Sequence, residues 1–186
     1  MAGVVAPPRT RGGIAAALLL GCAVAVALGV YGNQHKPVPH PLFLAGFSGA
    51  LQFKTWFATI GLVLVIGQLF GAMWMWGRLP GFGPAPAWVG PAHRWSGAIA
   101  FIVLIPVALN CLYSLGFQTY TTRVAVHSFA GCAFYGAYSA KMLGLRMRGL
   151  PGWALPVLGG LVFVAFIVVW WTSALWFFQQ PGRPLT

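Results

Sequence analysis

Two histidines, His93 and His127, stand at the start of successive apolar segments and share one local pattern. The first segment reads HRWSGAIAF from His93, and the second reads HSFAGCAFY from His127. A glycine follows four residues after each histidine, as Gly97 and as Gly131. On a helix this glycine lies one turn along the same face, so a flat group bound to the imidazole can approach the backbone closely. The pattern is typical of a buried haem, whose iron takes histidine as an axial ligand.

The composition limits the chemistry further, because the 186 residues include no Asp or Glu. Carboxylate acid–base catalysis, carboxylate metal sites and a carboxylate proton relay are therefore excluded. The chain is 59% hydrophobic and only 6% charged, whereas soluble domains carry about 25% charged residues, which indicates an integral membrane protein. The net charge of +11 comes from basic residues that flank apolar segments. This placement fits topology signals and lipid head groups, and we expect no nucleic-acid partner.

Five apolar segments approach or exceed the roughly 20 residues that a bilayer-spanning helix needs. We expect an all-α integral membrane bundle of five transmembrane helices, forming a single domain over residues 1–186. The expected helices cover residues 14–31, 55–76, 95–115, 124–145 and 154–178. Within the connection 32–54, the apolar residues of 41–53 predict a short interfacial helix or a re-entrant flap over the outer end of the bundle. The LLGC sequence ending at Cys22 loosely resembles a lipoprotein cleavage box, but the apolar run continues past it, so we expect the first helix to be retained.

The distribution of basic residues predicts how the bundle lies in the membrane. With the N-terminus inside, the outer side carries only Lys36, Lys54, Arg123 and Arg183, and the other Lys and Arg residues lie on the inner side. Because cytoplasmic loops carry an excess of Lys and Arg, we expect the N-terminus inside and the C-terminus outside. The expected location is the bacterial cytoplasmic membrane, with the chain as a multi-pass protein.

In this topology His93 lies on the inner side and His127 on the outer side. About 20 residues at 1.5 Å each separate their depths by roughly 30 Å, so the two histidines cannot ligate one iron. We expect one haem b at His127 and a second one if His93 also binds a haem. No histidine remains to pair with His93, and a methionine could serve instead. The candidates are Met73, Met75, Met142 and Met147. A five-coordinate inner haem, or an open site for a quinone, are the alternatives.

The outer side offers a fuller set of residues for a haem. His35 and His40, in the sequence QHKPVPH, could each fold over the bundle and supply the second axial ligand to a haem held by His127. Arg123, one turn before His127, together with Lys54 and Lys36, could neutralise the haem propionates. Two alternatives stay open: the histidines could make structural hydrogen bonds, and the HKPVPH loop could bind copper or zinc at the surface.

The chain resembles an uncharacterised family of small bacterial membrane proteins from residue 35 to the C-terminus. The most specific stretch is RVAVHSFAGCAFYGAYSAK at 123–141, joined by H-x-P at 35–37 and H-R-x-x-G at 93–97. The resemblance implies an association with small exported Rieske-type iron–sulfur proteins. More distantly, the H-R-x-x-G start is similar to transmembrane cytochromes b of the ascorbate- and ferric-reductase-like class. Those proteins carry four core histidines on four helices, whereas the second and fifth helices expected here carry none.

These observations predict a membrane haem b protein that transfers electrons between the quinol pool and an outer-face redox partner. The expected partner is a Rieske-type protein or a larger respiratory complex, and we expect an electron-transfer protein or oxidoreductase subunit rather than a stand-alone enzyme. The alternative is a haem-free accessory subunit of a respiratory membrane complex. A transporter is disfavoured because no acidic residue or inverted repeat marks an ion path. Gln68 and Asn110 are expected to join helices by hydrogen bonds.

Overall fold

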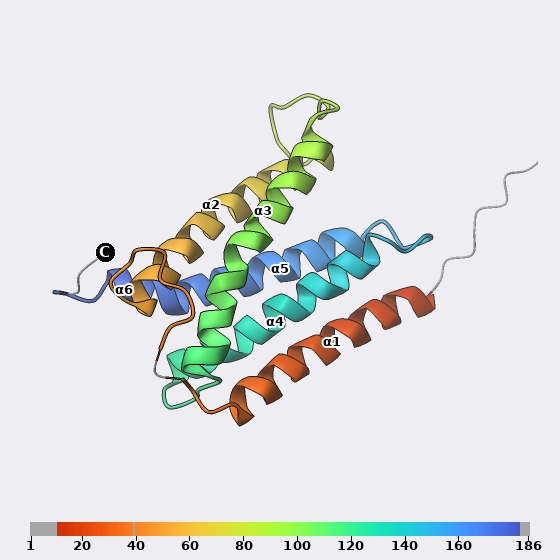
Figure 1. Cartoon of the computed structure of the whole chain (residues 1–186). Coiled ribbons are helices and arrows are strands. Elements are labelled where there is room, and N and C mark those ends of the chain that lie inside the picture. The colour runs from red at the N-terminus through yellow and green to blue at the C-terminus, as the bar shows by residue number, and fades with distance from the viewer. Residues whose placement is uncertain (1–10, 39, 183–186) are drawn as a thin grey trace, which may run out of the picture.

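A computed structural model describes residues 11–38 and 40–182, and all regular secondary structure in these residues is helical (Figure 1). Two continuous helices contain a π-helical segment, η1 after α3 and η2 between α5 and α6. The elements are α1 (Arg11–Gln34), α2 (Ala50–Met75), α3 (Val89–Leu109), η1 (Asn110–Leu115), α4 (Thr122–Gly144), α5 (Ala154–Trp170), η2 (Trp171–Leu175) and α6 (Trp176–Phe178). The described residues thus form five long helical segments, and each of the five expected ranges falls on one of them.

Four of these segments are long and apolar enough to cross a membrane, so the chain has the features of a multi-pass membrane protein. They are Gly12–Gln34, Ala50–Met75, Val89–Leu115 and Ala154–Phe178. The fifth segment, α4, has a comparable length but a less apolar sequence, with Arg123 and Lys141 close to its two ends. Its composition alone therefore does not qualify it as a membrane span.

The helices form two groups that meet at one end of the bundle. α4 packs between α1 and α5, whereas α2 packs mainly against α3. Figure 1 shows that the α2–α3 hairpin meets α5 near the end of α5 and diverges from α4 and α5 at its other end. We call the end where α4 begins the His127 end, and the end where α3 begins the His93 end.

Glycines allow α1 and α4 to touch along their backbones. A Cβ atom built on Gly21 of α1 would lie 2.6 Å from the carbonyl oxygen of Gly136, and one built on Gly136 of α4 would lie 2.5 Å from the carbonyl oxygen of Gly21. Ala17 and Ala140, which are both almost fully buried, extend this line of small residues. Close approach at small residues is a main source of helix association in membranes, and here it attaches α1 to the bundle.

The core of the bundle lies where the two groups of helices meet. Val65, Leu104, Phe134 and Phe166 form a buried cluster, with one residue from each of α2, α3, α4 and α5. The rings of Phe134 and Phe166 pack with their centroids 5.3 Å apart. This cluster lies between the two ends of the bundle and separates the two sites that the histidines occupy.

The connection between α1 and α2 differs from the sequence prediction. Of the two forms predicted for 41–53, the interfacial helix is wrong, because residues 41–49 form turns and bends and α2 begins at Ala50. The physical reason is the fully buried side chain of Asn110, at the start of η1. Its Oδ1 accepts hydrogen bonds from the backbone N–H groups of Leu42 (2.8 Å) and Phe43 (3.1 Å), and its Nδ2 donates to the carbonyl of Phe43 (2.8 Å). These bonds satisfy the backbone without a helix, so Asn110 joins a helix to a loop rather than to another helix.

Candidate functional site

A cavity of about 620 Å³ opens at the His127 end, which is within the size range of ligand-binding sites. Residues of α2, η1, α4, η2 and α6 line it, together with the connections around them. The lining residues include Lys54, Cys111, Arg123, His127, Ser128 and Trp176. The cavity therefore brings together His127, Arg123 and Lys54, three of the residues that the sequence assigned to one outer site.

The ring of His127 is held in one orientation and one tautomer by α5 and η2. Its Nδ1 lies 3.3 Å from the carbonyl oxygen of Val169 and 3.1 Å from the hydroxyl of Thr172. A carbonyl oxygen can only accept, and the hydroxyl of Thr172 donates to the carbonyls of Val168 (2.7 Å) and Val169 (3.2 Å). We therefore infer that Nδ1 carries the proton and that Nε2 of His127 keeps a free lone pair.

Histidines that bind metals are commonly fixed in this way, with one ring N–H donated to a carbonyl. No hydrogen bond to Nε2 is formed by any of the described residues, and His127 lines the cavity. The arrangement leaves Nε2 able to bind an iron or to accept a hydrogen bond from a ligand.

Two cations accompany His127 in this cavity. One guanidinium nitrogen of Arg123 donates a 2.6 Å hydrogen bond to the carbonyl of Thr172. The guanidinium carbon, Cζ of Arg123, lies 3.8 Å from the centroid of the Trp176 ring. Lys54 reaches the cavity from α2. Because the chain contains no Asp or Glu, neither side chain can be neutralised by a carboxylate side chain of the protein. The cavity thus suits a ligand that carries negative charge.

Both π-helical segments border this cavity. Cys111 and Ser114 reach it from η1, and Ser173 reaches it from η2. A π-helical turn displaces backbone carbonyls from their usual partners and is frequent at functional sites. Next to η2, the carbonyl of Val169 is available to His127, and within η2 the carbonyl of Thr172 is available to Arg123.

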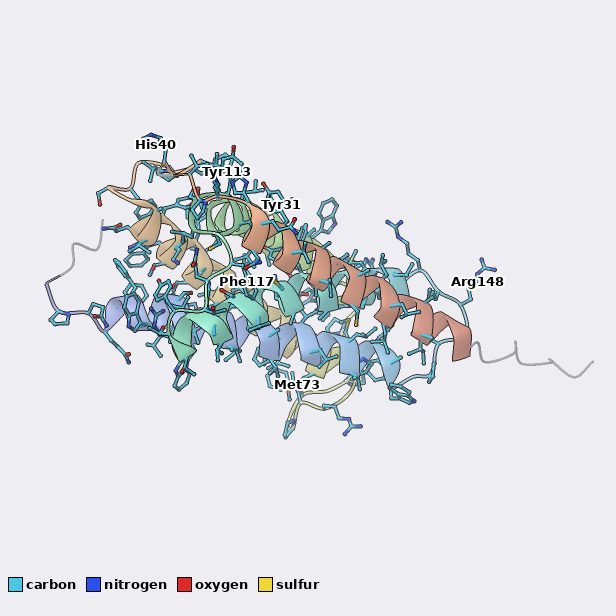
Figure 2. The ribbon with its side chains drawn as sticks, turned by 90° about the horizontal axis from the view of Figure 1, so that it is seen from below. Tyr31, His40, Met73, Tyr113, Phe117 and Arg148 are labelled. Atoms are coloured by element: carbon cyan, nitrogen blue, oxygen red, sulfur yellow. The ribbon has the colours of Figure 1, made fainter. Side chains whose placement is uncertain are left out.

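The structure does not bring the two loop histidines to His127. The ring of His35 stacks between Tyr31 and Tyr113, with centroid separations of 5.2 Å and 4.6 Å, and its Nε2 is buried without a hydrogen-bond partner among the described residues. His40 is exposed, and Figure 2 shows it on the outer edge of the connection, away from the helices. Neither histidine lines the cavity, and Lys36, which was predicted to bind a propionate, does not line it either.

The glycines that follow the two histidines differ in their surroundings. A Cβ atom on Gly131 would meet nothing within 4 Å, yet Gly131 does not line the cavity. At Gly97 the adjacent space is taken by Gln68, whose Oε1 would lie 2.9 Å from a Cβ atom. The close approach that we expected a flat group to make at Gly97 is made by the amide of Gln68.

His93 lines a second cavity, of about 480 Å³, at the opposite end of the bundle. The two cavities share no lining residue, which agrees with the expectation that His93 and His127 cannot serve one iron. Gln68 donates hydrogen bonds to the carbonyl of His93 (2.8 Å) and to the hydroxyl of Ser96 (2.6 Å), so it joins α2 to α3 as predicted. Nδ1 of His93 is buried and has no hydrogen-bond partner among the described residues.

Among the described residues, no second histidine lines the cavity that contains His93. Of the four methionines considered as its partners, Met73 and Met75 line the same cavity, whereas Met142 and Met147 do not. Within residues 11–38 and 40–182, no group of three or more His, Cys, Asp or Glu side chains is placed to hold a metal ion. This applies equally to the HKPVPH loop considered for copper or zinc.

The fold and the two cavities define a helical, multi-pass membrane protein with one histidine in a basic cavity at each end. Residues 14–185 match the model of the family of unknown function DUF6529, and the chain belongs to this family. This match confirms the predicted membership of an uncharacterised family and extends it towards the N-terminus. Comparisons with curated proteins and with solved structures give no significant match.

Sequence reasoning did not identify the partners that orient His127 and Arg123. Thr172 and the carbonyl of Val169 lie in the last apolar segment, which carries no histidine. The available signal was the Thr172–Ser173 pair, two hydroxyl residues within an otherwise apolar run. Such residues bond to carbonyls of the preceding turn, as Thr172 and Ser173 do here.

Proposed function

We propose that this protein is a five-span membrane haem b protein that carries electrons between the quinol pool and a redox partner on the outer face. The observation that supports this most is the geometry of His127, whose protonated Nδ1 is bound by Val169 and Thr172 while Nε2 is left free beside a cavity. A histidine held in this manner is the usual protein ligand of a haem iron.

The residues that line the cavity fit a haem. His127 would bind the iron, and Lys54 and Arg123 would bind the two propionates, for which the chain offers no competing carboxylate. When bound, the haem supplies a one-electron couple between ferric and ferrous iron. Trp176 packs on Arg123 and keeps its guanidinium at the cavity wall, and the Val169 carbonyl keeps the imidazole in the tautomer that donates through Nε2.

The proposal treats α4 as a fifth span. Its 23 residues extend about 34 Å at 1.5 Å per residue, enough for a hydrocarbon core of about 30 Å. It packs along α1 and α5, and both α1 and the segment Ala154–Phe178 that α5 begins are long and apolar enough to span. The charged residues that lower its hydropathy lie close to its ends, where they can reach the membrane surface. We further propose that the His127 end faces outward, following the excess of basic residues at the other end.

The test is the haem content of the purified protein and of three histidine variants. We expect detergent-purified protein to show a sharp reduced α-band and a b-type pyridine haemochrome. His127→Ala should lose this haem, whereas His40→Ala, at an exposed position outside the cavity, should retain it. His93→Ala should also retain the outer haem. A colourless, folded protein from a haem-replete host, or full haem retention in His127→Ala, would refute the proposal.

The second candidate function is a haem-free accessory subunit of a respiratory membrane complex. The observation that favours it is the lack of a second histidine among the described residues that line the His127 cavity. In that case His127 would be a structural residue that links α4 to α5. His127→Ala would then leave assembly with the complex nearly unchanged, which affinity purification of the tagged chain from its native membranes would measure.

A further inference from the structure

The cavity at the His93 end is a wedge between the α2–α3 hairpin and the α4–α5 pair. Gln68 and His93 line one side of it, and Tyr138, Lys141 and Phe163 line the other. Figure 1 shows that these two helix pairs diverge towards this end of the bundle. The wedge therefore lies between two diverging helix pairs, and it is not enclosed on all sides by helices.

Three cations line this wedge without a protein counter-ion. Arg78 follows α2, Arg94 lies in the first turns of α3, and Lys141 lies in the last turn of α4. Lys141 is partly buried, and none of the three side chains forms a hydrogen bond or ion pair with another described residue. Because the whole chain lacks Asp and Glu, no protein carboxylate side chain can compensate them. Arg78 and Arg94 are exposed, but the partly buried Lys141 is stabilised only if an anion from outside the chain binds beside it.

The rest of the wedge is apolar and extends from the cations towards the core. Leu69, Ala72, Leu104, Leu155 and Phe163 line it. Gly159 and Gly160 on α5 add free space, since a Cβ atom on either would meet nothing within 4 Å. A cationic mouth joined to a long apolar groove matches a ligand with an anionic head and a hydrocarbon chain.

We propose that this wedge binds an anionic phospholipid. Lys141, Arg94 and Arg78 would bind the headgroup phosphate, and an acyl chain would lie along α5 past Gly159 and Gly160. The three positive charges favour this ligand over a neutral quinone, since each cation near a membrane surface contributes to the binding of anionic lipid and none is needed for a quinone ring. The proposal does not depend on haem at the other end of the molecule.

The experiment is native mass spectrometry of delipidated full-length protein titrated with phosphatidylglycerol, and separately with phosphatidylcholine. We expect phosphatidylglycerol to bind about tenfold more tightly than phosphatidylcholine. Lys141→Gln should remove most of this preference. Arg146→Gln is the matched control, because Arg146 is an exposed cation just beyond α4 that does not line the wedge. It should bind phosphatidylglycerol like the unmodified protein.

A second variant tests the acyl-chain groove without changing a charge. Gly159→Leu would place its side chain in the free space of the wedge and should weaken binding of both lipids. The proposal is overturned if the two lipids bind equally, or if Arg146→Gln weakens binding as much as Lys141→Gln. It is also overturned if inorganic phosphate alone binds as tightly as phosphatidylglycerol, or if a short-chain quinone binds in the wedge more tightly than phosphatidylglycerol.

Discussion

Nδ1 of His127 lies 3.3 Å from the carbonyl oxygen of Val169, so a backbone group of α5 sets the orientation of the imidazole on α4. The carbonyl is accessible because it is followed by the π-helical segment η2. The same segment supplies the Thr172 carbonyl that holds Arg123 at 2.6 Å. The positions of the histidine and of the neighbouring cation are therefore both set by one irregular stretch of helix.

The Thr172 hydroxyl provides the first prediction, because it lies 3.1 Å from Nδ1 of His127. Thr172→Val keeps the side-chain shape but removes one of the two acceptors for the Nδ1 proton. The imidazole then becomes a weaker donor to iron, which favours the ferrous state. We expect the variant to bind haem but to have a higher midpoint potential, as measured by redox titration of the α-band.

The matched control for this prediction is Thr172→Ser, which keeps the hydroxyl and should keep the original potential. An unchanged potential in Thr172→Val would show that Val169 alone holds the ring. Loss of haem in both Thr172→Val and Thr172→Ser would instead show that Thr172 is needed for the fold of η2. That result would contradict a role of Thr172 in positioning His127.

Much of this fold follows from the sequence, and the exceptions have identifiable causes. The helix ranges could be predicted because hydropathy and length determine membrane helices largely from local composition. The interfacial helix over 41–53 was wrong because the fully buried Asn110 contacts this connection from a position far along the chain. Hydropathy carries no information about such a contact.

In the candidate site, too, contacts within one helix could be predicted from the sequence, whereas contacts between distant segments could not. The grouping of His127 with Arg123 could be predicted because they lie one turn apart on one helix. Lys54, on another helix, was correctly placed at the same end by its position before the second span. The placement of His35 could not be predicted, because its stacking between Tyr31 and Tyr113 depends on how η1 packs against the end of α1.

The contact between Gly21 and Gly136 predicts that α4 tolerates side chains unequally along its length. Gly136→Val would place its Cβ against the Gly21 carbonyl and should separate α1 from α4, at a cost of about 1–3 kcal/mol. Thermal unfolding of the purified protein, followed by fluorescence of its tryptophans, should show a lower Tm.

Gly131→Ala is the control for this change, because it lies on the same helix and its Cβ would meet nothing within 4 Å. We expect its Tm to stay close to that of the unmodified protein. Equal destabilisation by the two substitutions would point to loss of helix flexibility rather than to the α1–α4 contact.

The hydrogen bonds of Asn110 are predicted to keep the connection between α1 and α2 ordered. Asn110→Leu removes Oδ1, the single atom that accepts from the N–H groups of both Leu42 and Phe43, and each group left unpaired costs about 1–3 kcal/mol. The connection should then exchange its amide hydrogens faster and be cleaved more readily by a protease. Ser114→Ala, which removes a single 3.0 Å bond to the carbonyl of His40, should have a much smaller effect.

The position of α4 across the membrane can be tested with two single cysteines. His40 lies between α1 and α2, Arg148 lies between α4 and α5, and Figure 2 shows them at opposite ends of the bundle. Three helices, α2, α3 and α4, separate them in the chain, so they face opposite sides of the membrane only if α4 crosses it.

In a background without the three native cysteines, a membrane-impermeant maleimide applied to intact cells should label His40→Cys but should label Arg148→Cys only after the membrane is opened. Arg78→Cys, between α2 and α3, should behave like Arg148→Cys. If His40→Cys and Arg148→Cys react from the same side while Arg78→Cys reacts from the other, α4 does not cross, and the five-span arrangement is wrong.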